Sequence, residues 1–425
     1  MTSLLIKEVV HKDKIVDVYI ENGFIQQIHE KINKPAGEIM ECHGRKAILP
    51  AFYNGHTHAA MTLLRGYADD LPLFEWLDDY IWPAEAAFTP KHIEAGARLA
   101  CLEMIRSGTV FFNDMYWNPP VVIKAATDMG MRICTGPIAL DAYESGSRLS
   151  QQKDREDFLQ EMKSYSDLFI PSLNAHSIYS VLPETLDTIH SILEKYDLYF
   201  HIHLSETQKE VEDCLKTHGC RPVEYLDKIG LLTPKTIAAH GIHLTDRERK
   251  ILERKSVTLV HMPVSNMKLS NGSFDIPAAE KAGLQVILGT DGASSNNCLD
   301  MMGEMKTASL LAKHAWEDVT VLPAEKVFHM ATRAGAEAFG LHAGVIEVGY
   351  LADAILVDLK NPRLVPGYHL VSDMVYSADS SCIDSVICNG RFLMKNKKIE
   401  GEEAILEEVA KWKISDSKPH RYKDN

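Results

Sequence analysis

Two pairs of histidines in the sequence have the spacing that lets neighbouring imidazoles share a metal ion. His56 and His58 are separated by one residue, as are His201 and His203, and Glu206 follows the second pair. Alternate residues of a β-strand point to the same side, so each pair can direct both rings at one point. Neutral imidazole is a common ligand of Zn²⁺. Two exposed or hydrogen-bonded histidines can have the same spacing, and one member of the second pair could be a buried structural histidine.

Three more candidate residues stand where strand-like runs end. His176 closes the run LFIPSLNAH, His240 closes TIAAH, and Asp291 follows QVILGT. In a barrel of parallel strands the carboxyl ends meet at one mouth, so these side chains would converge with the histidine pairs. Imidazole and carboxylate ligands suit one divalent ion, for which we expect Zn²⁺, with Fe²⁺ or Mn²⁺ as alternatives. An aspartate before glycine is also typical of a turn or helix cap, so the metal site depends on the barrel.

The elements that must position these residues form an alternating series in the middle of the chain. Near-continuous apolar runs joined by helical patterns indicate a parallel sheet that is buried on both faces. Eight such units predict an α/β fold, a (β/α)8 TIM barrel over residues 51–344, with a doubly wound open sheet as the alternative. The eight runs are KAILPAFYNGH, TVFFNDM, RICTGPIAL, LFIPSLNAH, LYFHIHL, TIAAHGIHL, VTLVHMPV and QVILGTD.

Both ends of the chain have the alternating pattern of short strands. Asn22-Gly23 and Asn389-Gly390 each lie between two strand-like runs, which is a hairpin signal. Each terminal piece has too few strands to be stable alone. We therefore predict that residues 1–50 and 345–400 form one small β-sandwich domain, with two unrelated hairpins as the alternative. Residues 401–425 are expected to form a short helix and a polar tail.

Composition and charge exclude several classes of protein. The 45 basic and 59 acidic residues give a net charge of −14, which argues against a nucleic-acid partner. Eight cysteines without a C-x-x-C spacing indicate reduced thiols. The chain has no signal-peptide pattern and no apolar run of 18 residues, so we expect a cytoplasmic protein with no membrane partner. Nucleotide-binding glycine motifs and the G-x-S-x-G and H-E-x-x-H motifs are also absent.

Longer stretches around the candidate ligands resemble the amidohydrolase superfamily. They are LPAFYNGHTHAAMTLLRGYADDLPLFEWL, HIHLSET, AAHGIHL and ILGTDGASSNNCLDM. Within that superfamily the sequence is most similar to the methylthioadenosine/S-adenosylhomocysteine deaminases and their relatives, over nearly the whole chain. The relatives include 5′-deoxyadenosine deaminases and triazine hydrolases. The resemblance implies one divalent metal, usually zinc, held by His56, His58, His203 and Asp291.

The resemblance also implies roles for residues around the metal. Glu206 would carry a proton to the purine ring, His240 would hydrogen-bond the attacking water, and Asp291 would accept a proton from that water. Glu85 and His176 match substrate-contacting residues of the family. The family usually has proline two residues after this histidine, where this chain has Ile178, so the shape of the loop is left open.

Two further residues are candidates for substrate contact. Arg148 could meet the distal end of the substrate, or it could be an ordinary exposed arginine. Trp76, in the run Leu71–Leu77, could form an apolar wall for a 5′ thioether group together with Trp82, or it could simply pack in the core.

The function implied by the resemblance is hydrolytic deamination of an adenine nucleoside to the inosine analogue and ammonia. The candidate substrates are methylthioadenosine, S-adenosylhomocysteine, 5′-deoxyadenosine and adenosine. The alternatives are deamination of guanine, a pterin or cytosine, dechlorination of a triazine, and a barrel that binds a ligand without catalysis. The partner we expect is therefore a small purine nucleoside, and a homo-oligomer is left open.

Overall fold

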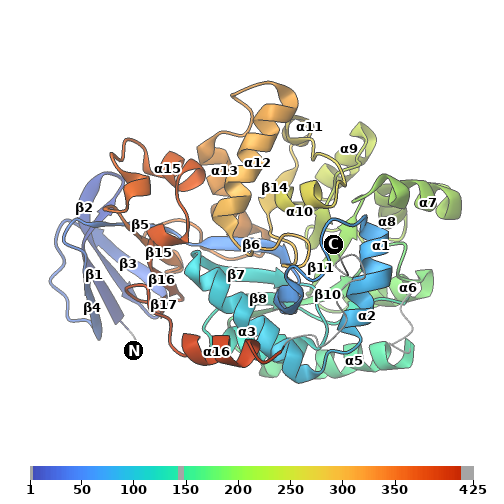
Figure 1. Ribbon diagram of the computed structural model, residues 1–425, viewed down its shortest axis with the longest axis horizontal. Coiled ribbons are helices and arrows are strands. Elements are labelled where there is room, and N and C mark those ends of the chain that lie inside the picture. The colour runs from blue at the N-terminus through green and yellow to red at the C-terminus, as the bar shows by residue number, and fades with distance from the viewer. Residues whose placement is uncertain (1–2, 142–147, 413–425) are drawn as a thin grey trace, which may run out of the picture.

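The strands of the protein form two sheets, one from the middle of the chain and one from its two ends (Figure 1). The computed structural model describes residues 3–141 and 148–412. Figure 1 shows strands from the two ends of the chain side by side at one end of the molecule, while helices surround the other sheet. Among the described residues, no helix combines the length and the apolar character needed to cross a bilayer.

The central sheet contains the eight predicted strands, which run parallel in chain order. Its strands are β6 (Phe52–Thr57), β7 (Thr109–Asp114), β8 (Arg132–Thr135), β10 (Phe169–Ala175), β11 (Tyr199–Leu204), β12 (Thr236–His240), β13 (Thr258–His261) and β14 (Gln285–Leu288), with the short β9 (Ile138–Ala139) beside β10. The ring closes just beyond β14, where the amides of Thr290 and Asp291 donate to His56 O at 3.2 and 3.0 Å. The predicted α/β barrel is therefore confirmed.

Burial explains why these strands read as continuous apolar runs. Every residue of β6, β7 and β11 is buried, as expected for parallel strands with side chains packed on both faces. Gly55 lets the first and last strands approach, because a Cβ atom there would lie 2.6 Å from the Cδ1 atom of Ile287. Two predicted runs are divided in the structure. KAILPAFYNGH divides at Ala51, where its first half is β5 (Lys46–Pro50) of the other sheet, and RICTGPIAL divides into β8 and β9.

Helices follow the barrel strands and cover their outer faces. They are α3 (Pro90–Arg106), α4 (Pro119–Asp128), α5 (Arg148–Glu161), α6 (Pro183–Leu193), α7 (Gln208–His218), α8 (Pro222–Lys228), α9 (Asp246–Arg254), α10 (Pro263–Lys268), α11 (Ile276–Lys281), α12 (Met301–Trp316), α13 (Ala324–Ala331) and α14 (Arg333–Ala338). Between β6 and α3 the chain forms a series of short helical turns: η1 (Ala59–Leu64), α1 (Leu73–Trp76), η2 (Leu77–Ile81) and α2 (Trp82–Glu85). A short turn, η3 (Met162–Ser164), precedes β10.

The second sheet joins the two ends of the chain, which confirms the predicted composite unit. It contains β1 (Ser3–His11), β2 (Lys14–Glu21), β3 (Phe24–His29), β4 (Glu38–Glu41) and β5 from the N-terminal side, and β15 (Ala354–Asp358), β16 (Ile383–Cys388) and β17 (Arg391–Met394) from the C-terminal side. These strands form a single mixed sheet, in which β5 pairs antiparallel with β15. The predicted domain boundaries stay predictions.

The remaining helical elements lie after the barrel. They are η4 (Pro362–Leu364), α15 (Leu370–Tyr376), η5 (Ser380–Cys382) and α16 (Glu402–Val409). The last of these is the short helix that we expected near the C-terminus, and the tail beyond residue 412 lies outside the described residues.

A buried ionic cluster joins the barrel to the terminal sheet. Arg132 Nε lies 3.0 Å from Asp353 Oδ2, to which the hydroxyl of Tyr53 also donates at 2.8 Å. The amide of Asn389 donates to the other oxygen of Asp353 at 2.6 Å. The carboxylate is fully buried and is satisfied by groups from both sheets, so the cluster ties the two together.

Candidate metal centre and substrate pocket

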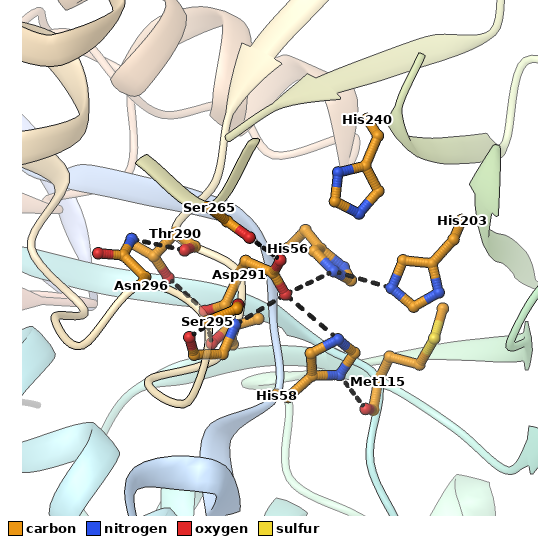
Figure 2. A network of polar contacts seen from close by, with 12 residues as sticks. His56, His58, Met115, His203, His240, Ser265, Thr290, Asp291, Ser295 and Asn296 are labelled. Atoms are coloured by element: carbon orange, nitrogen blue, oxygen red, sulfur yellow. Dashed lines mark hydrogen bonds and ion pairs between the residues drawn. The ribbon is translucent and has the colours of Figure 1, made fainter. Parts of the chain in front are cut away.

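Four of the predicted ligands meet at the carboxyl end of the barrel (Figure 2). His56 Nε2 lies 3.2 Å from His203 Nε2 and 3.5 Å from Asp291 Oδ1. His58 Nε2 lies 3.3 Å from the same oxygen of Asp291. Ligand atoms about 2.1 Å from one tetrahedral Zn²⁺ lie about 3.4 Å from each other. The spacing therefore fits one divalent ion at the centre of the four side chains.

Hydrogen bonds hold the far nitrogen of each histidine and so direct the near nitrogen to the centre. His58 Nδ1 donates to Met115 O and His203 Nδ1 donates to His176 O, each at 2.7 Å. His56 Nδ1 lies 2.9 Å from Nε2 of His201. A ligating imidazole needs a free lone pair on one nitrogen, and a hydrogen bond from the other nitrogen is the usual way to ensure it. This pattern makes the donor set suitable for a metal.

The two histidines of the second pair, His201 and His203, have different roles. His203 faces the centre, whereas His201 is buried behind His56. One member of this pair is therefore a candidate metal ligand, and the other is a buried structural histidine, which are the two alternatives that the sequence left open.

Burial and mutual contact set the charges of the cluster. Burial lowers the pKa of His56 to about 4 and holds the pKa of His203 well below its ordinary value, so both rings are neutral at pH 7. Burial alone would raise the pKa of Asp291, but hydrogen bonds from His56 and His58 hold it well below its usual range. Burial alone would lower the pKa of His58, but its hydrogen bond to Asp291 raises the pKa to about 9, so this ring is protonated in the metal-free cluster and releases that proton when a divalent cation binds.

Glu206 and His240 lie next to the ligands. Their side chains approach to 3.6 Å between Oε2 and Nε2, and both are buried. Burial is the main cause of a raised pKa at Glu206, which favours its protonated form. The backbone has positive φ at Ser205 (49°), His240 (72°) and Asp291 (61°), an uncommon conformation for residues other than glycine. Such angles are concentrated at functional sites, where the surrounding structure holds them in place.

Glu210 supports this backbone from helix α7. Its two carboxylate oxygens accept the amides of Ser205 and Glu206, each at 2.8 Å. Burial raises the pKa of Glu210 to about 8. The two hydrogen bonds to this carboxyl group hold the turn in which Glu206 leaves strand β11.

A pocket opens beside the cluster. Glu85 lines it, is buried, and has an Oε1 atom with no hydrogen-bond partner within the described parts of the chain. His176 and Trp76 also line it, so Trp76 both packs in the core and faces the pocket. The other lining residues are largely apolar: Met61, Leu73, Leu77, Trp82, Met115, Tyr116, Trp117, Ile138, Leu140, Tyr179, Leu269 and Ser295.

The structure thus brings together all but one of the predicted site residues. Arg148 is the exception: it begins helix α5, and its side chain lies outside the described residues. The loop that lacks the family's proline is held by His176 Nδ1 and the hydroxyl of Ser180, which lie 2.8 Å apart. The pocket nonetheless contains Tyr179 from that loop.

Sequence reasoning missed four polar residues that contact this site. Besides Glu210, they are Ser265, Asn266 and Asn271, which contact Asp291, His240 and Glu206, respectively. The available signal was a run of serine and asparagine directly after the seventh strand, PVSNMKLSNG.

Comparisons with known proteins agree with this geometry. The amidohydrolase family matches residues 47–393. A 5-methylthioadenosine/S-adenosylhomocysteine deaminase of Archaeoglobus fulgidus is 44% identical over 92% of this chain and 94% of its own length. A 5′-deoxyadenosine deaminase of Methanothermobacter thermautotrophicus is 42% identical over 92% of this chain and 91% of its own.

Solved structures have the same fold. The crystal structure of an adenosine deaminase from Xanthomonas campestris with bound zinc superposes with a TM-score of 0.91 at 32% identity, covering 97% of this chain and 98% of that one. The matched region contains the whole barrel with its histidine and aspartate cluster. The chain therefore belongs to the amidohydrolase family.

Proposed function

We propose that this protein is a metal-dependent hydrolase that deaminates an adenine nucleoside to the inosine analogue and ammonia. The observation that carries the proposal is that buried Glu206 and Glu85 line the same pocket as the metal-binding cluster. Glu206 can protonate a ring nitrogen of the base, and Glu85 can bind the diol of the sugar. The names of the relatives support the same class of substrate.

His56, His58, His203 and Asp291 would hold the metal ion. When bound, such an ion supplies Lewis-acid chemistry and lowers the pKa of a water toward neutrality. We propose zinc, because the donor set of imidazoles and one carboxylate suits it and a 32%-identical relative was crystallised with zinc.

The reaction adds water to C6 of the purine and releases ammonia. Asp291 accepts a proton from the attacking water, and His240 hydrogen-bonds the attacking oxygen through Nε2. Glu206 gives a proton from Oε2 to ring N1, so negative charge does not accumulate on the ring. As the C6–N6 bond breaks, the proton on Asp291 passes to the departing nitrogen. The hydroxyl on C6 returns a proton to Glu206, so the products are ammonia and the inosine analogue with hydrogen on N1.

The rest of the pocket fits a nucleoside. The unpartnered oxygen of Glu85 can accept hydrogen bonds from ribose hydroxyls, because a carboxylate accepts two such bonds. His176 lies beside the cluster, where it can contact the base. The apolar wall that includes Trp76 suits a 5′ substituent such as a thioether.

The test is a panel of substrates given to the purified protein. Adenosine, 5′-deoxyadenosine, methylthioadenosine and S-adenosylhomocysteine are followed by ammonia release and by the absorbance change on deamination. We expect turnover of at least one of them. Guanine, a pterin, cytosine and a chlorotriazine serve as outgroups, and turnover of outgroups alone would overturn the nucleoside assignment.

The location of the protein is a separate proposal. All eight cysteines are free thiols in the structure, and seven of them are at least partly buried. Reduced thiols are typical of the cytoplasm, which is where we propose that the protein acts. A homo-oligomer stays a prediction.

A further inference from the structure

We propose that one short segment, residues 263–271, positions all three groups that act on the attacking water and the purine ring: the two proton carriers, Asp291 and Glu206, and the hydrogen-bonding His240. The segment follows strand β13, which contributes none of the four proposed metal ligands. It comprises helix α10 and the turn after it, and it forms one hydrogen bond to each of the three groups. The inference rests on the proposed function and assigns roles to Ser265, Asn266 and Asn271.

Ser265 sets the rotation of the aspartate carboxylate. Its hydroxyl donates to Asp291 Oδ2 at 2.6 Å, while the other oxygen, Oδ1, lies 3.3–3.5 Å from the Nε2 atoms of His56 and His58. Both Ser265 and Asp291 are buried, so water does not compete for this contact. With Oδ2 held from behind, Oδ1 stays directed at the metal centre, as Figure 2 shows.

Asn266 sets the tautomer of His240. Its Oδ1 atom lies 2.9 Å from His240 Nδ1. Because an amide oxygen can only accept, Nδ1 bears the hydrogen and donates the hydrogen bond. With Nδ1 as the donor, Nε2, the atom that faces Glu206, is the nitrogen that can present a lone pair. That lone pair is what allows His240 to accept a hydrogen bond from the attacking water.

Asn271 sets which oxygen of Glu206 carries the proton. Its Nδ2 atom donates to Glu206 Oε1 at 2.7 Å. An oxygen that accepts a hydrogen bond is disfavoured as the protonated one, so the proton resides on Oε2. Oε2 is also the oxygen nearer to His240.

The segment is rigid enough for this task because it is anchored on several sides. Pro263 begins the helix, and the amide of Val264 donates to the buried Glu304 at 3.3 Å. Lys268 forms an ion pair with Asp69 in the loop that follows η1.

The end of the segment is anchored as well. The amide of Asn271 donates to Asn266 O at 3.0 Å, and the carbonyl of Asn271 accepts from Nε2 of His243 at 2.7 Å. The three polar side chains are therefore presented from a fixed backbone, which is the condition for precise placement of reacting groups.

Three single substitutions separate the three roles. For Ser265→Ala we expect zinc affinity, measured by competition with a chelator, to fall 10- to 100-fold, the usual cost of losing a hydrogen bond to a metal ligand. For Asn266→Leu and Asn271→Leu we expect unchanged zinc affinity and KM, with kcat lowered at least about 10-fold. Leucine is a suitable replacement at position 266, because Asn266 Nδ2 has no partner among the residues that the structure describes.

The controls test whether the segment merely maintains the fold. Met267 lies in the same helix, and its side chain is 52% exposed. Met267→Ala should therefore alter neither zinc affinity nor kcat. Ser265→Thr keeps the hydroxyl and should restore zinc binding, and Asn271→Gln keeps the donor and should restore part of kcat. Thermal unfolding of each variant is measured beside the zinc affinity.

The outcomes separate the inference from the proposed function. Equal losses of zinc affinity, kcat and melting temperature in all three variants would overturn the positioning roles, as would a Ser265→Ala protein that binds zinc like the wild type. A wild-type protein that turns over no adenine nucleoside would refute the proposed function, and the zinc measurement on Ser265→Ala would still decide whether this residue supports the metal centre.

Discussion

The proposed ligands are side chains whose second polar atom is already occupied by the protein. His58 and His203 donate to backbone carbonyls, and Asp291 accepts from Ser265. These outer contacts restrict each side chain to one orientation before an ion arrives, which lowers the entropy that binding must remove. The geometry of the metal centre therefore depends on the hydrogen-bond partners of the ligands as well as on the ligands themselves.

At this scale Glu206 offers the sharpest test of the chemistry. Glu206→Gln removes the titratable proton and keeps the size of the side chain, so the variant should retain zinc while kcat falls about 10²- to 10⁴-fold. Ammonia release and metal analysis measure the two quantities. The matched control is Glu212→Gln, an exposed position on helix α7. Full activity in Glu206→Gln would remove this residue from the mechanism.

Glu85 gives a prediction about pH. Burial raises its pKa to about 7 from an ordinary 4.5, so folding favours the protonated form, and the free energy of unfolding falls as pH rises through 7. Glutamine has no such cost, so Glu85→Gln should be stabilised relative to the wild type at pH 8, by up to about 3 kcal/mol, and not at pH 4.5. Denaturant unfolding of the ligand-free protein at both pH values measures the difference. An equal change in stability at pH 4.5 and pH 8 would contradict a raised pKa of the buried Glu85 carboxyl group.

The ligands could be predicted from the sequence, but most of their supports could not. Histidines at the ends of strand-like runs are informative, so His56 and His203 stand out among the 19 histidines of the sequence. Ser265 and Asn271 are of types that most often mark turns, and nothing in a single sequence distinguishes a turn asparagine from one that contacts a carboxylate 65 residues away. Only the folded barrel brings such pairs together.

At the scale of elements, helix α3 packs closely against η1 and fixes the position of the backbone just after His58. A Cβ atom on Gly96 would lie 2.6 Å from the carbonyl oxygen of Ala60, and the hydroxyl of Thr62 donates to Gly96 O at 2.7 Å. The amide of Ala59 donates to Asp114 at the end of β7. The turn that follows the first histidine pair is thus held on two sides.

Gly96→Ala should disturb both stability and the metal centre. The added methyl group meets backbone rather than a flexible side chain, so we expect a loss of about 1–3 kcal/mol in the free energy of unfolding together with weaker zinc binding. Gly303→Ala is the control. Gly303 is exposed on helix α12, and a Cβ atom there meets nothing within 4 Å, so the substitution should stabilise the helix by about 0.5–1 kcal/mol. A neutral Gly96→Ala variant would show that η1 can move away freely.

Elements were predictable where burial leaves a continuous apolar run. All eight barrel strands have such runs, and the helices between them have a polar face. The break at Ala51 was not predicted, although Pro50 stands directly before it, because the apolar stretch continues from one sheet into the other. What separates the two strands is the change of partners, which depends on distant parts of the chain.

At the scale of the whole molecule, the buried cluster around Asp353 connects the two sheets. Asp353→Ala leaves the guanidinium of Arg132 buried and unpaired, so we expect the free energy of unfolding to fall by about 3–5 kcal/mol, measured by denaturant unfolding. The exposed pair of Lys7 and Glu41 provides the comparison, and Glu41→Gln should change stability by less than about 1 kcal/mol. Equal effects would mean that the buried pair contributes no more than one in solvent.

The pairing of β5 with β15 has a consequence for the order in which the protein is made. Leu49 leaves the ribosome about 300 residues before its register partner Ile355, so the nascent chain carries a half-finished sheet through the synthesis of the entire barrel. Through that interval the edge of β5 is open to pairing with another polypeptide. A chain that is truncated before β15 should therefore aggregate or recruit chaperones, even though every proposed metal ligand has already been translated.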